Sequence, residues 1–327
     1  MSTSSSSSSF HRDKPLLTGS VTATTREKYR KAVLDFATWS IDNDRDATTT
    51  DELDDLLMDY FHDLWDNGEP KSRASVTYCA VICFLPKMTK RLHGAKRCLK
   101  GWDKLVPGKS HPPLSKHLAM VIALQMARRN YYSMAIGTLL AFDCFLRVSE
   151  LVNITRGDIA DAGDLRISPL HESMMIRLQK TKTGINQHVN VLDANVQLLV
   201  RDLMTRDRPG MATRFNKSST NKLFDFTADK YRYVFKGVCA ELKLSPDYVP
   251  HSLRHGGATH YHHVMKMSVE DVLQRGRWVS VASARRYIQS GRAVLLSYEV
   301  PSKLQHLAAD LIIGDNIITY LSLTQKH

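Results

Sequence analysis

Residues 251–287 read HSLRHGGATHYHHVMKMSVEDVLQRGRWVSVASARRY, and this segment combines a His, an Arg, a Trp and a Tyr. His251 and Arg254 are three residues apart, so a helix that begins here directs both side chains toward the same ligand. Trp278 follows a glycine-containing break, and Tyr287 comes nine residues later, in what the composition predicts to be the next helix. This order suits covalent attack by a phenol on a phosphate that the His and the Arg hold.

The HxxR pattern, the GxW pattern and the Tyr nine residues further on resemble the tyrosine recombinase, or phage integrase, family. The resemblance is strongest to the Cre-like members, which have Trp where many relatives have His. It extends loosely over residues 20–327 and closely over residues 139–290. It implies a mainly α fold with a small antiparallel β-sheet, arranged as a two-domain DNA clamp. It also implies site-specific DNA recombination through a 3′-phosphotyrosine intermediate, a Holliday junction and strand exchange in a homotetramer on DNA.

The composition favours a polyanionic partner such as nucleic acid. The chain has 327 residues, with 45 Lys and Arg against 33 Asp and Glu and a net charge of +12. Its five Cys include no CxxC pair, which argues against a disulfide framework or a zinc ribbon and favours a reducing, intracellular setting. The sequence shows no secretory signal and no apolar run of about 20 residues. We therefore expect a soluble protein located with the DNA, in the nucleus of a eukaryote or the cytoplasm of a bacterium.

Shifts in composition divide the chain into four parts. Residues 1–20 are Ser-rich and lack apolar periodicity, which predicts a disordered tail. Residues 21–100 carry helical apolar stripes and form a predicted helical domain, the core DNA-binding domain of the resemblance. Gly and Pro residues predict a linker over residues 101–113. Residues 114–327 form the predicted catalytic domain, whose last amphipathic helix the resemblance assigns to oligomerisation.

The starts of the first two helices are predicted by capping-box spacing. Thr24 with Glu27, and Thr49 with Glu52, each place a threonine three residues before a glutamate at the head of an apolar stripe.

Charge within the first domain is sorted along the chain. Residues 42–69 hold eleven Asp and Glu with one Arg, whereas residues 71–104 hold nine Lys and Arg with one Asp. If this domain binds DNA, the basic part should contact the phosphates; the alternative is a solvated basic face. The candidate phosphate contacts are Lys71, Arg73, Lys87, Lys90, Arg91, Lys96, Arg97 and Lys100.

Arg147 lies in the apolar run LLAFDCFLRVSELV, where an unpaired charge would be strongly destabilising. An ion pair with Glu150, three residues later, is one explanation. The resemblance gives another: an Arg in the same LRVSEL context grips the scissile phosphate and, with Arg254, places two guanidinium forks on its nonbridging oxygens. Glu150 then matches the acidic position that supports these arginines in the family.

Alternating apolar and polar residues on both sides of KTKTG predict a β-hairpin, residues 174–178 with residues 189–191, and residues 165–167 are a candidate third strand. Lys180 and Lys182 fall in its turn, where a lysine is most often simply solvated. The resemblance selects Lys182 as the general acid that protonates the 5′-oxygen leaving group.

The resemblance distributes the remaining roles. Tyr287 is the nucleophile, His251 assists its proton transfer, and Trp278 donates its indole N–H to a phosphate oxygen, with core packing as the alternative role of Trp278. His251 and His255 are also spaced like two metal ligands on a helix. No HExxH motif and no Cys partner accompanies them, so we expect neither a metal nor a cofactor.

Two other functions stay open beside recombination. A type IB topoisomerase-like enzyme would use the same Tyr chemistry without synapsis, and a recombinase-derived DNA-binding protein would have lost cleavage. The sequence has all six chemical positions, which argues against the second alternative. We expect double-stranded DNA as the partner, and a monomer or weak oligomer in its absence.

Overall fold

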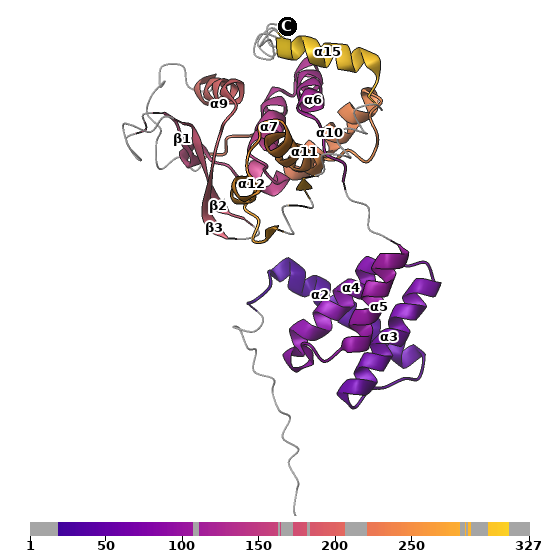
Figure 1. Ribbon diagram of the computed structural model, residues 1–327. Helices are drawn as coiled ribbons and strands as arrows, with labels where there is room; N and C mark the ends of the chain where they lie inside the picture. Colours follow the sequence, from indigo (N-terminus) through magenta and orange to yellow (C-terminus); the bar gives the residue numbers. More distant parts are fainter. Residues whose placement is uncertain are drawn as a thin grey trace, which may run out of the picture. The chain divides into compact units, whose positions relative to one another are not determined.

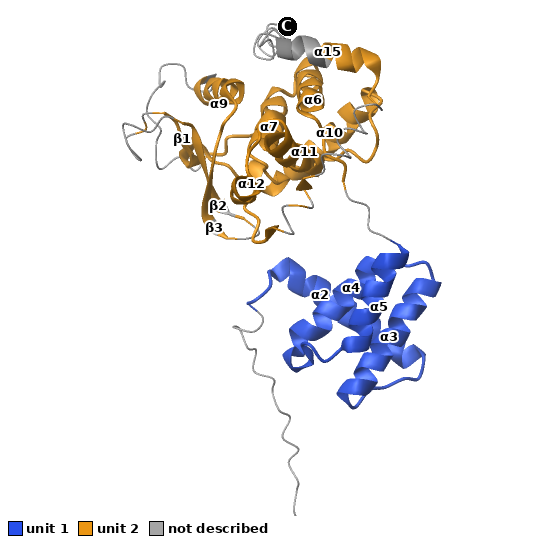
Figure 2. Cartoon of the chain, viewed as in Figure 1, with its two compact units in different colours: residues 1–109 blue, residues 110–327 orange. Residues whose placement is uncertain are grey.

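The chain forms two compact units, residues 1–109 and residues 110–327 (Figures 1 and 2). The computed structural model describes residues 19–106, 111–162, 164, 173–181, 184–206, 221–281, 285, 287–288 and 300–313. Helices predominate in both units, and the second also contains a three-stranded antiparallel sheet. The predicted mainly α fold with a small antiparallel sheet is therefore confirmed. No helix of the described part is long and apolar enough to cross a membrane.

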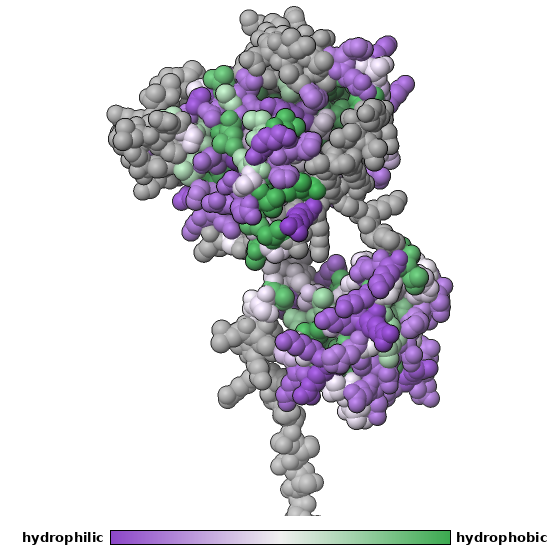
Figure 3. Space-filling view, in the orientation of Figure 1, coloured by the Kyte–Doolittle hydropathy of each residue, from purple (hydrophilic) through white to green (hydrophobic). Residues whose placement is uncertain are grey.

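The first unit is built around one apolar helix face. Its elements are α2 (Ala23–Asp42), α3 (Thr50–Asp66), α4 (Lys71–Phe84), the 3₁₀ turn Pro86–Met88 and α5 (His93–Leu105). Leu57 and Phe61 of α3 are almost completely buried and belong to one cluster with Phe36 of α2 and Trp102 of α5. Hydrophilic residues cover most of the face of this unit that Figure 3 shows. The apolar stripe predicted from the sequence is thus the core, and the charged residues surround it.

Thr49 and Glu52 form the predicted capping box at the start of α3. The Glu52 amide donates to Thr49 Oγ1 at 3.2 Å, and the Thr49 amide donates to Glu52 Oε2 at 3.0 Å. The same prediction for Thr24 was wrong by two residues, because Thr22 is the N-cap of α2 and accepts from the Thr25 amide at 3.2 Å.

The predicted start of the linker at residue 101 was also wrong. Helix α5 continues through Gly101 to Leu105. A glycine inside a helix costs only about 1 kcal/mol relative to alanine, and the buried Trp102 side chain keeps this turn packed on the core. The chain divides after residue 109, later than the predicted domain end at residue 100.

Helix α7 is the centre of the second unit. This unit contains α6 (Lys116–Arg128), α7 (Tyr132–Asp143), α8 (Val148–Leu151), the 3₁₀ turn Arg156–Asp158, β1 (Ile159–Ala160), β2 (Met175–Lys180), β3 (Ile185–Asn190), α9 (Ala194–Arg206), α10 (Ala228–Glu241), α11 (Pro250–His263), α12 (Val269–Gly276) and α15 (Ser302–Ile313). Every residue of α7 from Met134 to Asp143 is buried. The helix packs against α6, α9 and α11 (Figure 1).

The sheet has the order β1-β2-β3, and both pairs are antiparallel. Ile176 of β2 lies opposite Val189 of β3, which confirms the predicted hairpin and its register of buried residues. The third strand is β1, a two-residue strand that is too short for its alternation to be recognised in the sequence. Residues 165–167, the candidate third strand, lie outside the described residues.

Two adjacent glycines let α11 approach its neighbours closely. A Cβ on Gly256 would collide with the backbone carbonyl of Leu114, and a Cβ on Gly257 would collide with the carbonyl of Phe142 in α7. The Leu114 amide also donates to the Ser252 carbonyl at 3.1 Å. The position of α11, which carries His251 and Arg254, thus depends on these backbone contacts.

Replacing Gly257 by Ala should destabilise the second unit. The added methyl must displace α7 or the Phe145 ring, and overpacking of this kind costs about 1–3 kcal/mol. Gly237→Ala on the exposed face of α10 is the matched control, because its Cβ would meet only a side-chain atom of Arg129 at 3.9 Å. The free energy of unfolding of the control should rise by about 0.5–1 kcal/mol, because alanine favours a helix more than glycine does. Urea unfolding measures both, and equal stability of Gly257→Ala and the unchanged protein would contradict the close packing.

Candidate active site

Arg147 and Glu150 form the corner between α7 and α8. Arg147 Nη1 donates to Glu150 Oε1 at 2.5 Å, and the Arg147 amide donates to Glu150 Oε2 at 2.9 Å. The ion pair considered from the sequence is therefore present. The Arg147 side chain is 18% exposed, whereas the Glu150 side chain is 2% exposed. Arg147 can therefore reach a ligand from this corner while it remains paired.

Arg254 approaches the same corner from α11 and is completely buried. Its two terminal nitrogens donate to the carbonyls of Phe145 and Gly276, and Nη1 is 4.0 Å from Glu150 Oε2. Burial lowers the pKa of Arg254 to about 9, and the charge of Arg147 adds to this, so the group stays cationic at neutral pH. Arg254 Nε is buried and has no hydrogen-bond partner among the described residues, so this N–H remains available to a ligand.

Arg277 is a third arginine at the same carboxylate, and the sequence did not single it out. Its Nη2 donates to Glu150 Oε2 at 3.0 Å. Burial raises the pKa of Glu150, but Arg277, the Arg147 amide and the other two guanidiniums outweigh burial and hold that pKa below its usual range. Three cations thus face one anion, Glu150, and the cluster carries a net charge of two positive units. Such an excess in a buried cluster favours an anionic ligand.

Tyr287 is placed against this cluster by α11. Its phenol oxygen is 3.3 Å from His251 Nε2, and its backbone carbonyl accepts from Thr259 Oγ1 at 3.1 Å. The Tyr287 ring stacks on His255 with centroids 4.3 Å apart. Burial lowers the pKa of His251 to about 4, with Arg254 adding to the effect. A neutral imidazole next to the phenol can accept its proton.

Trp278 has the core packing considered for it, and its role as a donor to a phosphate oxygen stays a prediction. Its ring is buried in a cluster with Phe145, and the Arg254 guanidinium lies 4.6 Å from the ring centroid. Its Nε1 is buried and has no hydrogen-bond partner in the described part of the chain. A buried donor without a partner is costly, so a ligand oxygen at this position would be stabilised.

Lys182, the predicted general acid, lies outside the described residues, so its role stays a prediction. The base of its hairpin is held to the site by Arg275, which donates to the carbonyl of Asn190 in β3 at 2.8 Å and to that of Asp143 in α7 at 2.7 Å. The Tyr261 hydroxyl donates to the Asp143 carboxylate. These three side chains join the hairpin, α7 and α11, and sequence patterns did not reveal them.

The eight basic residues predicted to contact DNA fall into two groups. Lys71 pairs with Asp103 at 2.5 Å, and Arg73 pairs with Glu69 at 2.7 Å, so both are partly neutralised within the first unit. The other six are exposed, and no ion pair involves them in the described residues. They are Lys87, Lys90, Arg91, Lys96, Arg97 and Lys100.

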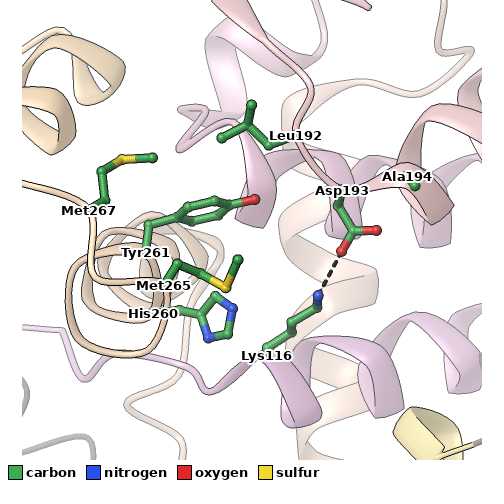
Figure 4. Close-up of a pocket in the computed structure, with 8 residues that line it drawn as sticks. All are labelled: Lys116, Leu192, Asp193, Ala194, His260, Tyr261, Met265 and Met267. Carbon is green, nitrogen blue, oxygen red and sulfur yellow. Dashed lines mark ion pairs between the residues drawn. The ribbon is translucent and has the colours of Figure 1, made fainter. Parts of the chain in front are cut away.

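A pocket of about 370 Å³ opens on the other end of α11 (Figure 4). Lys116 and Asp193 form an ion pair at 2.7 Å in its wall, and His260 lies beside Lys116. The predicted catalytic residues do not line this pocket. The candidate chemistry therefore belongs to the arginine cluster and Tyr287, and not to this cavity.

The structure brings five of the six predicted catalytic residues and Glu150 together, and it adds Arg277 and His255. The spacing of His255 from His251 was noted in the sequence only as that of two metal ligands, whereas the structure stacks the His255 ring on Tyr287. Arg277 gave no such signal, because its contacts depend on the backbone turn after α12.

Comparison of the chain with known proteins identifies a protein family and several similar solved structures. Residues 118–293 match the phage integrase family. The chain resembles the Tn1549 transposon integrase in complex with circular intermediate DNA, with a TM-score of 0.55, 13% identity and coverage of 83% of this chain and 98% of that one. It also resembles a lambda integrase dimer bound to a COC′ core site, with a TM-score of 0.56, 14% identity and coverage of 85% and 92%. At these identities the likeness shows a shared fold. No curated protein matches the chain.

Acid should destabilise the second unit through partly buried histidines such as His260. Burial lowers the pKa of His260 to about 4, with Lys116 and His117 adding to the effect and Asp193 opposing it. Because an unfolded His has a pKa of about 6.5, the unfolded chain binds more protons between about pH 6.5 and 4, and the free energy of unfolding falls as pH falls.

His260→Asn should therefore flatten the dependence of the urea midpoint on pH between pH 7 and 4.5. His263→Asn, at an exposed position on the same helix, is the control and should keep the original slope. Equal slopes in all three proteins would show that His260 is not the group responsible.

Proposed function

Because the chain belongs to the phage integrase family of tyrosine recombinases, we propose that it is a site-specific DNA recombinase that cuts and rejoins DNA through a 3′-phosphotyrosine intermediate. The observation that carries the proposal is the position of the Tyr287 phenol, 3.3 Å from His251 and beside a buried cluster of guanidiniums. A nucleophile, a base and a site for an anion meet at one place.

Cleavage begins with attack of Tyr287 Oη on the scissile phosphorus. The bond from phosphorus to the tyrosine oxygen forms while the bond to the 5′-oxygen breaks. His251, kept neutral by its pKa of about 4, accepts the phenol proton, and Lys182 supplies a proton to the leaving 5′-oxygen. The products are a 3′-phosphotyrosine and a free 5′-hydroxyl.

The charge that develops on the phosphate oxygens is met by fixed donors. Arg147 offers its partly exposed side chain, Trp278 offers an indole N–H that has no partner among the described residues, and Arg254 adds positive charge and its Nε. Both terminal nitrogens of Arg254 bind carbonyls, so it does not present the open fork expected from the sequence. Donors that are already in place need little reorganisation in the transition state.

Strand exchange is the reverse of cleavage with a different strand. The 5′-hydroxyl of a partner strand attacks the phosphotyrosine, and Tyr287 leaves and recovers its proton. The phosphotyrosine ester keeps the energy of the phosphodiester, so this step needs no external energy source.

The proposed partner is double-stranded DNA, and the proposed assembly is a homotetramer on DNA in which the C-terminal segment docks on a neighbouring protomer. Leu304 and Leu307 of α15 pack against the core of their own unit, so they are used within the protomer. The proposed location is wherever the DNA is, in the nucleus of a eukaryote or the cytoplasm of a bacterium.

Two measurements separate this proposal from its alternatives. A type IB topoisomerase-like enzyme would relax supercoiled DNA without exchanging strands between two differently marked duplexes. A DNA-binding protein without catalysis would form no covalent adduct.

Tyr287→Phe should abolish covalent attachment to DNA. The DNA would be selected from random sequence by the pure protein and then nicked near the cleaved bond, so that cleavage is trapped. We expect the unchanged protein to form an adduct that resists detergent, and Tyr287→Phe to form none because it lacks the attacking oxygen. Tyr233→Phe, at an exposed position, is the control and should retain the adduct. An adduct that persists in Tyr287→Phe would refute this nucleophile.

Arg97→Ala should weaken DNA binding by removing one phosphate contact. The logarithm of the binding constant falls with the logarithm of salt concentration, and one lost contact should reduce that slope by about 1. Lys71→Ala is the control, because Lys71 is paired with Asp103 and should change the slope less. Titrations at several salt concentrations measure both slopes. A larger change for Lys71→Ala would contradict the assignment of the exposed group.

A further inference from the structure

We propose that Arg277 is a positioning residue for the phosphate-binding arginines, and that it acts through Glu150. The inference rests on the proposed recombinase function and deepens it. It is drawn from the backbone conformation of Arg277, its contacts and the charge balance of the cluster.

The backbone of Arg277 is in a conformation that usually requires glycine. Arg277 is the C-cap of α12 with φ 55° and ψ 43°, and its amide donates to the Gln274 carbonyl at 3.0 Å. The left-handed region is unfavourable for residues with a Cβ, and glycine is the common residue at such helix ends. An arginine here needs side-chain contacts that offset the backbone cost.

The Arg277 side chain makes such contacts, although only 6% of the residue is exposed. Nη2 donates to Glu150 Oε2 and to the Phe145 carbonyl, each at 3.0 Å. Nη1 donates to the Arg275 carbonyl at 2.8 Å and to the Cys144 carbonyl at 3.4 Å. One guanidinium therefore joins the end of α12 to the corner that carries Arg147.

Glu150 divides its carboxylate between two arginines. Oε1 accepts from Arg147 at 2.5 Å, and Oε2 accepts from Arg277 at 3.0 Å. If Arg277 were absent, Oε2 would have lost its nearest cation, and Arg147 and Arg254 alone would have to compensate Glu150. The cluster would then hold one net positive charge instead of two. Arg277 thus leaves the charge of the other two arginines available to the phosphate.

Arg277 also precedes Trp278 directly in the chain. The Trp278 ring lies 4.6 Å from the Arg254 guanidinium, and its centroid is 4.6 Å from that of Tyr287. Fixing the backbone at residue 277 therefore fixes the ring that covers Arg254 and borders the nucleophile.

The test compares Arg277→Gly with Arg277→Lys on the trapped DNA substrate. Glycine relieves the backbone at φ 55° while it removes every side-chain contact. Lysine keeps the charge, but one ammonium cannot span Glu150 and three carbonyls. Arg201→Ala is the matched control, because it removes an ion pair that is remote from the site. In that pair Arg201 Nε lies 2.6 Å from Asp161 Oδ2. Cleavage rate, DNA affinity and thermal stability are measured for each.

We expect Arg277→Gly to cleave about tenfold more slowly or worse, with DNA affinity within about twofold of the unchanged protein. The cleavage rate of Arg277→Lys should lie between those of Arg277→Gly and the unchanged protein. If Arg277→Gly does not fold, Arg277→Lys alone is compared with the unchanged protein. Arg201→Ala should cleave at the original rate. Cleavage at the original rate by both Arg277 variants overturns the inference.

A double variant shows whether Arg277 acts through Glu150. Glu150→Gln removes the negative charge that Arg277 compensates, so Arg277→Gly should slow cleavage less in that background than in the unchanged protein. If the rate reduction in the double variant equals the product of the reductions in the two single variants, Arg277 is only a structural cap and the inference is overturned. A protein that forms no Tyr287-dependent adduct before any change at residue 277 overturns the proposed function itself, and this inference with it.

Discussion

One buried carboxylate holds the candidate active site together. Glu150 faces the guanidiniums of Arg147, Arg277 and Arg254 at 2.5, 3.0 and 4.0 Å. Removing one member of such a cluster leaves an uncompensated buried charge, which is strongly destabilising. The excess of positive charge in this cluster also constrains its ligand, because an anion that binds from outside the protein balances that charge best. Under the proposed function, a DNA phosphate would supply that anion at Arg147, whose side chain is partly exposed.

The rest of the second unit keeps this cluster in place. Gly256 allows α11 to lie close to the backbone of Leu114, and Gly257 allows it to lie close to α7, so that Arg254 reaches the carbonyl of Phe145 at the α7–α8 corner. Arg275 then joins the end of α7 to strand β3, which leads to the hairpin that carries Lys182 in the sequence. The fold thus brings groups from the α7–α8 corner, from α11 and from the end of α12 to one carboxylate and one phenol.

Much of this arrangement follows from local sequence patterns. Three local patterns are found in the structure: the capping box at Thr49, the alternation that gives β2 and β3, and the helical spacing of His251 and Arg254 in α11. These patterns, with the resemblance in the last segment, were sufficient to predict the fold class and to select candidate residues that the structure places together; their catalytic roles stay predictions.

The features that the sequence did not predict depend on contacts between distant residues. Helix α5 continues through Gly101 because the Trp102 side chain is buried in the core. Strand β1 is only two residues long and is defined by its pairing with β2. Arg277 is recognisable only once its left-handed backbone and its carboxylate partner are seen, since neither has a local signal.

The most direct measurement is a crystal structure of the Tyr287→Phe protein bound to the DNA that it selects. We predict a phosphate with nonbridging oxygens about 3 Å from the Arg147 guanidinium and from Trp278 Nε1, while Glu150 keeps its bond to Arg277. A DNA backbone that passes the site with no phosphate within reach of Arg147 would contradict the role given to this cluster.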